Sequence, residues 1–121
     1  MSFRIEGLRS TKGQVMACLT TVPRSFPQCK EGKLTRSRLA IPAAQAATID
    51  FGPVEKGTYA IAILHDENGN GKVDYALFIP KEGFGFSRNP VVRTGPPSFE
   101  SAAFAVGDAP VQLTIRMRYM F

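Results

Sequence analysis

Residues that can offer an oxygen ligand, four through the side chain and one through the backbone carbonyl, stand at alternate positions between residues 66 and 74, a spacing that is typical of a metal site. The positions are Asp66, Asn68, Asn70, Lys72 and Asp74, with Gly71 before Lys72. They match the D-x-[DN]-x-[DN]-G pattern of calcium loops, in which alternate residues turn toward one point. Ca²⁺ takes about six to eight oxygen ligands, and glycine permits the sharp turn after which the Lys72 carbonyl faces the ion. We therefore predict a Ca²⁺ site; the alternative is a metal-free turn held by Asx hydrogen bonds.

One ligand of the usual calcium loop is missing from this run. The twelfth position, where an EF-hand loop has a bidentate glutamate, is Leu77. Another carboxylate must complete the shell; Glu82 is nearest in the sequence, and Glu100 is the second candidate. With two acidic side chains in the loop itself, we expect a modest affinity, with a dissociation constant of about 10⁻⁴–10⁻³ M.

His65 is the single histidine of the chain, and it directly precedes this loop. Together with Ser87 and Asp74 it has the residue types of a nucleophilic triad, which would make the protein a small hydrolase. Ser87 lacks the context of a nucleophile elbow, however. The alternative is a histidine that is hydrogen-bonded to the backbone of the loop.

A run of glycine and phenylalanine follows the loop, with polar residues at its end: Phe84, Phe86, Ser87, Arg88 and Asn89. Two aromatic rings among glycines, with polar neighbours, suit a platform for a small ligand such as a sugar or a peptide. The alternative is that the rings pack on the body of the protein and anchor the loop.

The net charge of +5 is concentrated in the first third of the chain. Residues 1–40 hold eight basic and two acidic side chains, the basic ones being Arg4, Arg9, Lys12, Arg24, Lys30, Lys33, Arg36 and Arg38. They are not interleaved with aromatic residues, and no zinc-finger or RNP-type motif is present, so we do not expect a nucleic-acid partner. A solvated basic face is the main interpretation, and a metal-free binder of an anionic partner is the alternative.

Short strands are needed to position these residues, and alternation of apolar and polar residues predicts them. Residues 58–64 are apolar on both faces, which indicates a central strand covered from both sides. The other expected strands lie within residues 3–6, 15–19, 46–51 and 111–119, with weaker candidates at 36–41 and 101–106. About seven strands in one domain, residues 1–121, predict an all-β antiparallel sandwich.

Composition and the two cysteines bear on the compartment. No apolar run approaches the roughly 20 residues of a transmembrane helix, so we expect no membrane insertion. Cys18 and Cys29 are eleven positions apart, which does not fit a CxxC motif; they form a disulfide in an oxidising compartment or remain two reduced thiols. The N-terminal residues alternate like a strand and do not resemble a signal peptide, so either the protein is cytoplasmic or the chain begins after processing.

The run His65-Asp66-Glu67-Asn68-Gly69-Asn70-Gly71-Lys72-Val73-Asp74, followed by Ile79-Pro80-Lys81-Glu82-Gly83-Phe84-Gly85-Phe86-Ser87, resembles the bacterial family called domain of unknown function 2141. Residues 57–60 and 95–102 also fit, so the resemblance covers nearly the whole chain. It implies a transthyretin-like (prealbumin-like) β-sandwich that is exported, and hence periplasmic or secreted, and it implies no activity. A disulfide between Cys18 and Cys29 fits an exported member.

Transthyretin-like sandwiches include a hydrolase of purine-degradation intermediates, but this chain does not have the Tyr-Arg-Gly-Ser ending of that enzyme. We therefore expect no enzyme. The expected function is that of a binding or cell-envelope interaction module with one structural Ca²⁺, whose partner would be a protein, a peptide or a glycan.

Overall fold

The computed structural model describes residues 1–26, 37–67, 75–76, 79–80, 83–91 and 97–119. Within these residues the chain forms ten strands, one short α-helix and two 3-10 turns. The strands are β1 (Ser2–Glu6), β2 (Gln14–Thr20), β3 (Ser37–Pro42), β4 (Thr48–Asp50), β5 (Gly57–Asp66), β6 (Tyr75–Ala76), β7 (Ile79–Pro80), β8 (Gly83–Phe86), β9 (Phe104–Val106) and β10 (Thr114–Arg116). The helix α1 is Phe99–Ala102, and the 3-10 turns are η1 (Pro23–Ser25) and η2 (Ala43–Gln45).

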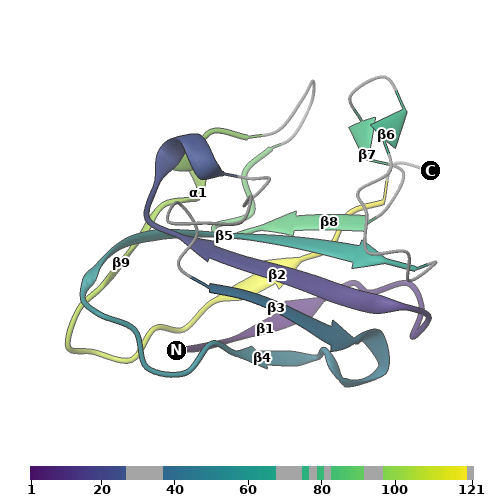
Figure 1. The fold of residues 1–121 in the computed structure, drawn as a ribbon, viewed down its shortest axis with the longest axis horizontal. Helices are drawn as coiled ribbons and strands as arrows, with labels where there is room; N and C mark the ends of the chain where they lie inside the picture. Colours follow the sequence, from purple (N-terminus) through teal and green to yellow (C-terminus); the bar gives the residue numbers. More distant parts are fainter. Residues whose placement is uncertain (27–36, 68–74, 77–78, 81–82, 92–96, 120–121) are drawn as a thin grey trace.

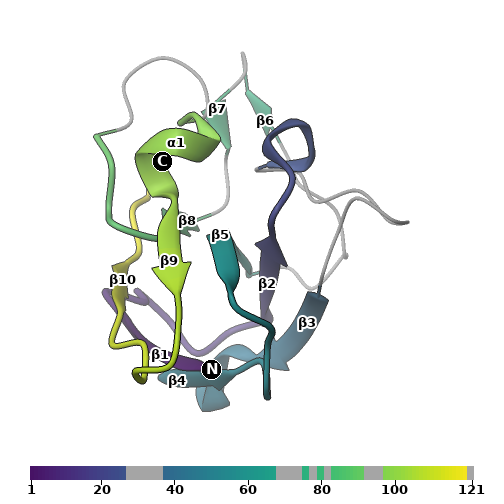
Figure 2. The same ribbon diagram turned by 90° about the vertical axis from the view of Figure 1, so that its left-hand side faces the viewer.

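Two sheets face each other, which confirms the predicted all-β sandwich (Figures 1 and 2). One sheet has the order β10-β1-β4, and the other has the order β3-β2-β5-β8 with β9 also paired to β5. A separate two-stranded ladder joins β6 to β7. Among the described strand pairs, β1 and β10 are parallel and the others are antiparallel.

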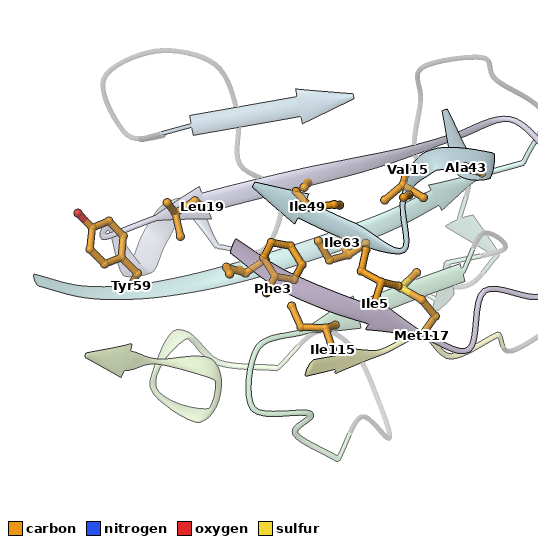
Figure 3. Packing of buried hydrophobic residues seen from close by; sticks show 13 residues of the cluster. Phe3, Ile5, Val15, Leu19, Ala43, Ile49, Tyr59, Ile63, Ile115 and Met117 are labelled. Atoms are coloured by element: carbon orange, nitrogen blue, oxygen red, sulfur yellow. The ribbon is translucent and has the colours of Figure 1, made fainter. Parts of the chain in front are cut away.

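The main core lies between the two sheets, and β1, β4 and β10 bury every second residue toward it, as alternation predicts. Side chains from β1, β4 and β10 point toward those from β2 and β5 (Figure 3). The buried members are Phe3, Ile5, Val15, Ala17, Leu19, Ala43, Ala46, Ile49, Tyr59, Ile61, Ile63, Ile115 and Met117. Their burial fixes the register of each strand, since a slip by one residue would turn its apolar set to solvent.

Strand β5 is the central strand that the sequence predicted. It pairs with β2 on one side and with β8 on the other. Its inner face contributes to the main core, whereas Ala60 and Ala62 on its outer face belong to a second buried cluster. Four phenylalanines of that cluster come from other elements: Phe26, Phe84, Phe86 and Phe99. Small alanines on β5 leave room for these rings.

The final segment of the chain passes from one sheet to the other and is therefore not the single strand expected over residues 111–119. Its β10 part pairs with β1, and the Met117 N–H still donates to Glu6 O at 2.8 Å. One residue later, Arg118 forms an isolated bridge with Phe84 of β8. The segment thus closes one side of the sandwich.

Candidate functional site

The start of the predicted calcium loop lies at the end of β5, at the end of the sandwich where β2 begins (Figure 1). Asp66 is fully buried there, and its Oδ2 accepts a hydrogen bond from Gln14 Nε2 at 3.1 Å. Gly13, with φ +69°, packs directly on the Asp66 carbonyl, where a Cβ would overlap the oxygen. Glycine is required at residue 13 for both reasons.

Glu67, the next residue, is held by the loop that precedes β2. Its Oε1 accepts hydrogen bonds from Arg9 Nε at 2.8 Å and from a second Arg9 nitrogen at 2.5 Å, and its Oε2 accepts one from Ser10 Oγ at 2.8 Å. The hydrogen bonds from Arg9, with a smaller contribution from Ser10, hold the pKa of Glu67 below its ordinary value against the effect of burial. Glu67 is thereby a fixed carboxylate beside Asp66.

Tyr119 lies under the same arginine. The Arg9 guanidinium carbon is 4.3 Å from the centre of the Tyr119 ring, a cation–π distance, and the Arg9 backbone N–H donates to Tyr119 Oη at 3.1 Å. Gly83 of β8 makes room for the ring, because a Cβ at residue 83 would overlap it. Burial raises the pKa of the Tyr119 hydroxyl above its ordinary value.

His65 is fully buried, and both ring nitrogens have partners. Its Nε2 lies 2.8 Å from the Lys12 carbonyl oxygen, which only accepts, so Nε2 carries the proton. Its Nδ1 lies 2.7 Å from Tyr119 Oη and accepts the hydroxyl proton. His65 is therefore hydrogen-bonded to a backbone carbonyl, as in the alternative to a catalytic role, but this carbonyl belongs to the turn before β2 and not to the predicted calcium loop.

The structure does not bring His65 and Ser87 together, so the hydrolase hypothesis was wrong to pair these two residues. The Ser87 backbone N–H donates to Ile61 O, and Ile61 precedes His65 by four residues on β5. Four residues of a strand span about 13 Å. The Ser87 hydroxyl donates to Ala102 O at 2.5 Å and accepts from the Ile61 N–H at 3.0 Å. It joins α1 to β5, and a buried hydroxyl so engaged is a structural link.

The glycine–phenylalanine run forms a strand, and its rings are inside the protein. Phe84 and Phe86 are buried in the second cluster, where Phe86 contacts Phe26 edge to face at 5.7 Å. Arg88 and Asn89 form the following turn with φ values of 65° and 48°. Their side chains bind the backbone of Ala103, Thr114 and Arg116. These residues thus act as internal anchors, and the rings do not form an exposed platform.

The remaining candidate residues are placed as follows. Asn68, Asn70, Lys72, Asp74 and Glu82 lie outside the described residues. Glu100 is exposed on α1, whose last residue is linked through Ser87 to Ile61, toward the opposite end of β5 from Asp66. In the described part of the chain, no group of three or more His, Cys, Asp or Glu side chains is arranged to hold a metal.

The cysteines and the basic residues are only partly described. Cys18 is buried in β2, and Cys29 lies outside the described residues, so their pairing stays a prediction. Arg4 is exposed on β1 and Arg24 is exposed in η1, on different elements of the fold. Lys12 is exposed beside β2, while Lys30, Lys33 and Arg36 and the side chain of Arg38 are outside the described part.

Sequence reasoning missed the partners that surround the loop start, namely Arg9, Ser10, Gln14 and Tyr119. They come from separate parts of the chain, and no local motif marks them. Within the described residues, no helix has the length and apolar character needed to cross a membrane.

Comparison with known proteins assigns the chain to a family. Residues 3–114 match the model of a family described as uncharacterised proteins conserved in bacteria, DUF2141. No curated protein and no solved structure matches the chain significantly. Since the match spans most of its length, the chain belongs to the bacterial family DUF2141.

Proposed function

We propose that this protein binds one Ca²⁺ at the loop that begins with Asp66, and that the ion is a structural part of a binding module of the bacterial cell envelope. The proposal is supported by the opposite directions of the first two loop residues. The Asp66 carboxylate is buried beside Gln14, whereas the Glu67 carboxylate turns to Arg9 and Ser10. A calcium loop needs this alternation, with its first residue toward the ion and its second residue away from it.

The register between β5 and β8 is the observation that gives the proposal its strongest support. His65 pairs with Gly83. Asp66 follows His65 in the chain and Glu82 precedes Gly83, and consecutive Cα atoms are about 3.8 Å apart. The two proposed carboxylate ligands, Asp66 and Glu82, are therefore each one residue along the chain from the paired residues His65 and Gly83. This favours Glu82 over Glu100 as the carboxylate that completes the shell.

The envelope role is supported by membership of a bacterial family and by the sandwich fold. In this proposal the sandwich is transthyretin-like, and the protein is periplasmic or secreted. A disulfide between Cys18 and Cys29 would suit such an oxidising compartment. The ion holds the loop in one conformation, and the partner of the module is a protein, a peptide or a glycan.

Thermal unfolding of the EDTA-treated protein tests the calcium site. We expect a few millimolar CaCl₂ to raise Tm by several degrees and an equal concentration of MgCl₂ to raise it much less, because Mg²⁺ demands a smaller octahedral site. Asp66→Asn should abolish the calcium-specific rise. Asp108→Asn is the matched control, because Asp108 is exposed and pairs with Lys56 at the other end of β5.

Absence of a calcium-specific rise in the unmodified protein would refute the calcium site. A rise that Asp66→Asn leaves intact would show that the ion binds elsewhere.

A further inference from the structure

The outer face of the sheet β10-β1-β4 carries a hollow that lies apart from the calcium loop. We propose that this hollow binds an acidic saccharide, with the Arg4 guanidinium on the carboxylate of the sugar and neighbouring hydroxyl and amide groups on its hydroxyls. The inference extends the proposed binding module by naming a ligand for it. It does not depend on the calcium site, because all the residues that line the hollow are other, described residues.

The hollow is large enough for a small molecule. Its volume of about 460 Å³ lies within the range of roughly 300–1,000 Å³ that is common for ligand sites. Buried and exposed residues alternate along β1, β4 and β10, and the exposed ones stand on the face that is turned away from the main core (Figure 2). The polar residues that line the hollow are all exposed: Ser2, Arg4, Thr48, Gln112 and Thr114.

Strand pairing places three of these polar side chains in one row across the sheet. Arg4 pairs with Thr48 of β4 on one side and with Thr114 of β10 on the other side. Neighbouring strands are about 4.8 Å apart, so a threonine hydroxyl flanks the stem of Arg4 on each side. Ser2 and Gln112, each two residues earlier on its own segment, form a second polar row on the same face.

Arg4 is the one charged residue that lines the hollow, and its charge is not balanced by a neighbour. Two other charges on this face are paired, because Arg116 lies 3.6 Å from Glu6 and Asp50 lies 3.6 Å from the terminal amino group. Within the described part of the chain, the side chain of Arg4 has neither an ion pair nor a hydrogen bond. Its guanidinium is therefore available to an anion.

A single guanidinium suits a single negative charge. Its planar fork donates two parallel hydrogen bonds to a carboxylate. A phosphate dianion is typically held by free backbone N–H groups or by further cations. Strand β1 is paired on both sides, so its N–H groups are directed to the neighbouring strands and not into the hollow. The chemistry of the hollow therefore favours a carboxylate over a phosphate.

The neutral groups around Arg4 indicate what else the ligand carries. Hydroxyl and amide side chains both donate and accept hydrogen bonds, which is the capacity that the hydroxyls of a sugar require. Val111 and Leu113, which are half-buried at the same hollow, offer an apolar wall to the C–H groups of a sugar ring. A ring with several hydroxyls and one carboxylate is a uronate.

The test is an NMR titration of the full chain in calcium-free buffer with glucuronate, glucose, acetate and inorganic phosphate. We expect glucuronate at millimolar concentration to give saturable shifts at the amides of the hollow. Glucose lacks the carboxylate and acetate lacks the sugar hydroxyls, so both should bind at least about tenfold more weakly. Inorganic phosphate should also bind more weakly than glucuronate.

Variants assign the binding to particular side chains, and the Tm of each variant verifies that it is folded. Arg4→Gln should weaken glucuronate binding about tenfold, and Arg4→Lys, which keeps the charge without the planar fork, should recover part of the loss. The double variant Thr48→Val, Thr114→Val keeps the branched shape and should weaken the binding of glucuronate but not of acetate. Arg24→Gln, at an exposed position of η1, is the matched control and should leave the affinity within about twofold.

Three results would overturn the inference. Equal binding of glucuronate by Arg4→Gln and the unmodified protein, or equal binding of glucose and glucuronate, would show that Arg4 does not hold a carboxylate. Acetate or phosphate binding as tightly as glucuronate would show a general anion site and not a saccharide site. Absence of shifts with glucuronate would refute the site altogether, and the calcium site would be unaffected, because its own test is the calcium-specific rise in Tm.

Discussion

Asn89 shows how one short side chain can take the place of a strand partner. Its side-chain NH₂ donates to Thr114 O at 3.0 Å, and its Oδ1 accepts from the Arg116 N–H at 2.8 Å. A neighbouring strand would offer the same donor and acceptor to these two backbone groups of β10. The left-handed backbone of Asn89, which asparagine tolerates, directs the amide toward them.

Loss of this amide should destabilise the sandwich. We expect Asn89→Ala to lower the free energy of unfolding by about 1 kcal/mol, and Asn89→Asp to lower it at least as much, because a carboxylate oxygen would face the Thr114 carbonyl. Urea unfolding measures both. Gln112→Ala, at an exposed position, is the control, and equal losses in the control and in Asn89→Ala would contradict the bridging role.

Asp50 gives a pH dependence whose sign follows from its contacts. Its Oδ1 accepts the Gly52 N–H at 2.8 Å, and this hydrogen bond is the main cause that holds the pKa of Asp50 below its ordinary value of 3.8. A lowered pKa in the folded state means that the folded state binds fewer protons. The stabilisation is therefore present above that ordinary value and is lost as the pH falls through the folded-state pKa.

We expect Asp50→Asn to reduce the loss of Tm on acidification, because the asparagine oxygen accepts the same hydrogen bond at every pH. Tm measured between about pH 2.5 and 5.5 tests this, with Asp108→Asn as a control for loss of an exposed aspartate. An unchanged acid dependence in Asp50→Asn would contradict the assignment.

At the scale of elements, the two faces of β8 carry side chains of different size. Its phenylalanines fill the second cluster, while its glycines face the last segment of the chain. A Cβ at Gly85 would lie 2.8 Å from Ile115 Cγ2 and 3.0 Å from the Met117 sulfur. The glycines thus allow the two sheets to approach closely on this side.

Gly85→Ala should therefore be destabilising through overpacking, by about 1–3 kcal/mol in urea unfolding. Gly107→Ala is the matched control, because a Cβ there meets nothing within 4 Å and the change should be small. Equal stability of the two variants would show that the space beside Gly85 is not limiting.

The elements that the sequence predicted well are those with one buried and one exposed face. Strands β1, β2 and β4 and the doubly covered β5 follow from the pattern of residues alone. Of the strand expected at residues 101–106, the part Phe104–Val106 is β9, whereas Ser101 and Ala102 belong to the helix α1. Ser98 caps it by accepting from the Ser101 N–H, and Phe99 and Ala102, three residues apart, form its buried side.

Strand β8 was read as a loop for a related reason. Gly83 and Gly85 occupy the face that would otherwise carry the alternating side chains, so no apolar–polar pattern is present. Glycine is needed at these two positions because Tyr119, Ile115 and Met117 pack against them, and these residues lie about 30 residues away in the sequence. Spacing within a short window does not contain this information.

At the scale of the whole molecule, one part of the candidate site could be predicted from the sequence and another part could not. The loop motif is local, and the sequence indicates it directly. The contacts of Arg9 with Glu67 and with Tyr119 span 58 and 110 positions of the sequence, so they form only when the sheets are assembled. Arg9 was counted among scattered basic residues for this reason.

The cysteines allow a prediction about the compartment of the folded protein. If Cys18 and Cys29 are paired, maleimide labelling of protein denatured without reductant should add no label, and reduction should expose two thiols. Reduction should also lower Tm, because a closed loop of this size contributes about 3 kcal/mol in the chain-entropy model. Two labelled thiols before reduction would contradict the pairing and remove one support for an exported protein.

The parallel pairing of β1 with β10 has a consequence for how the protein is made. Arg4 lies opposite Thr114, so β1 completes its sheet only when a segment 110 residues later has been synthesised. At ordinary rates of bacterial translation that interval is roughly 5–20 s. Until then β4 is the one described strand that β1 can pair with, so this sheet stays incomplete while the residues between β4 and β10 are synthesised.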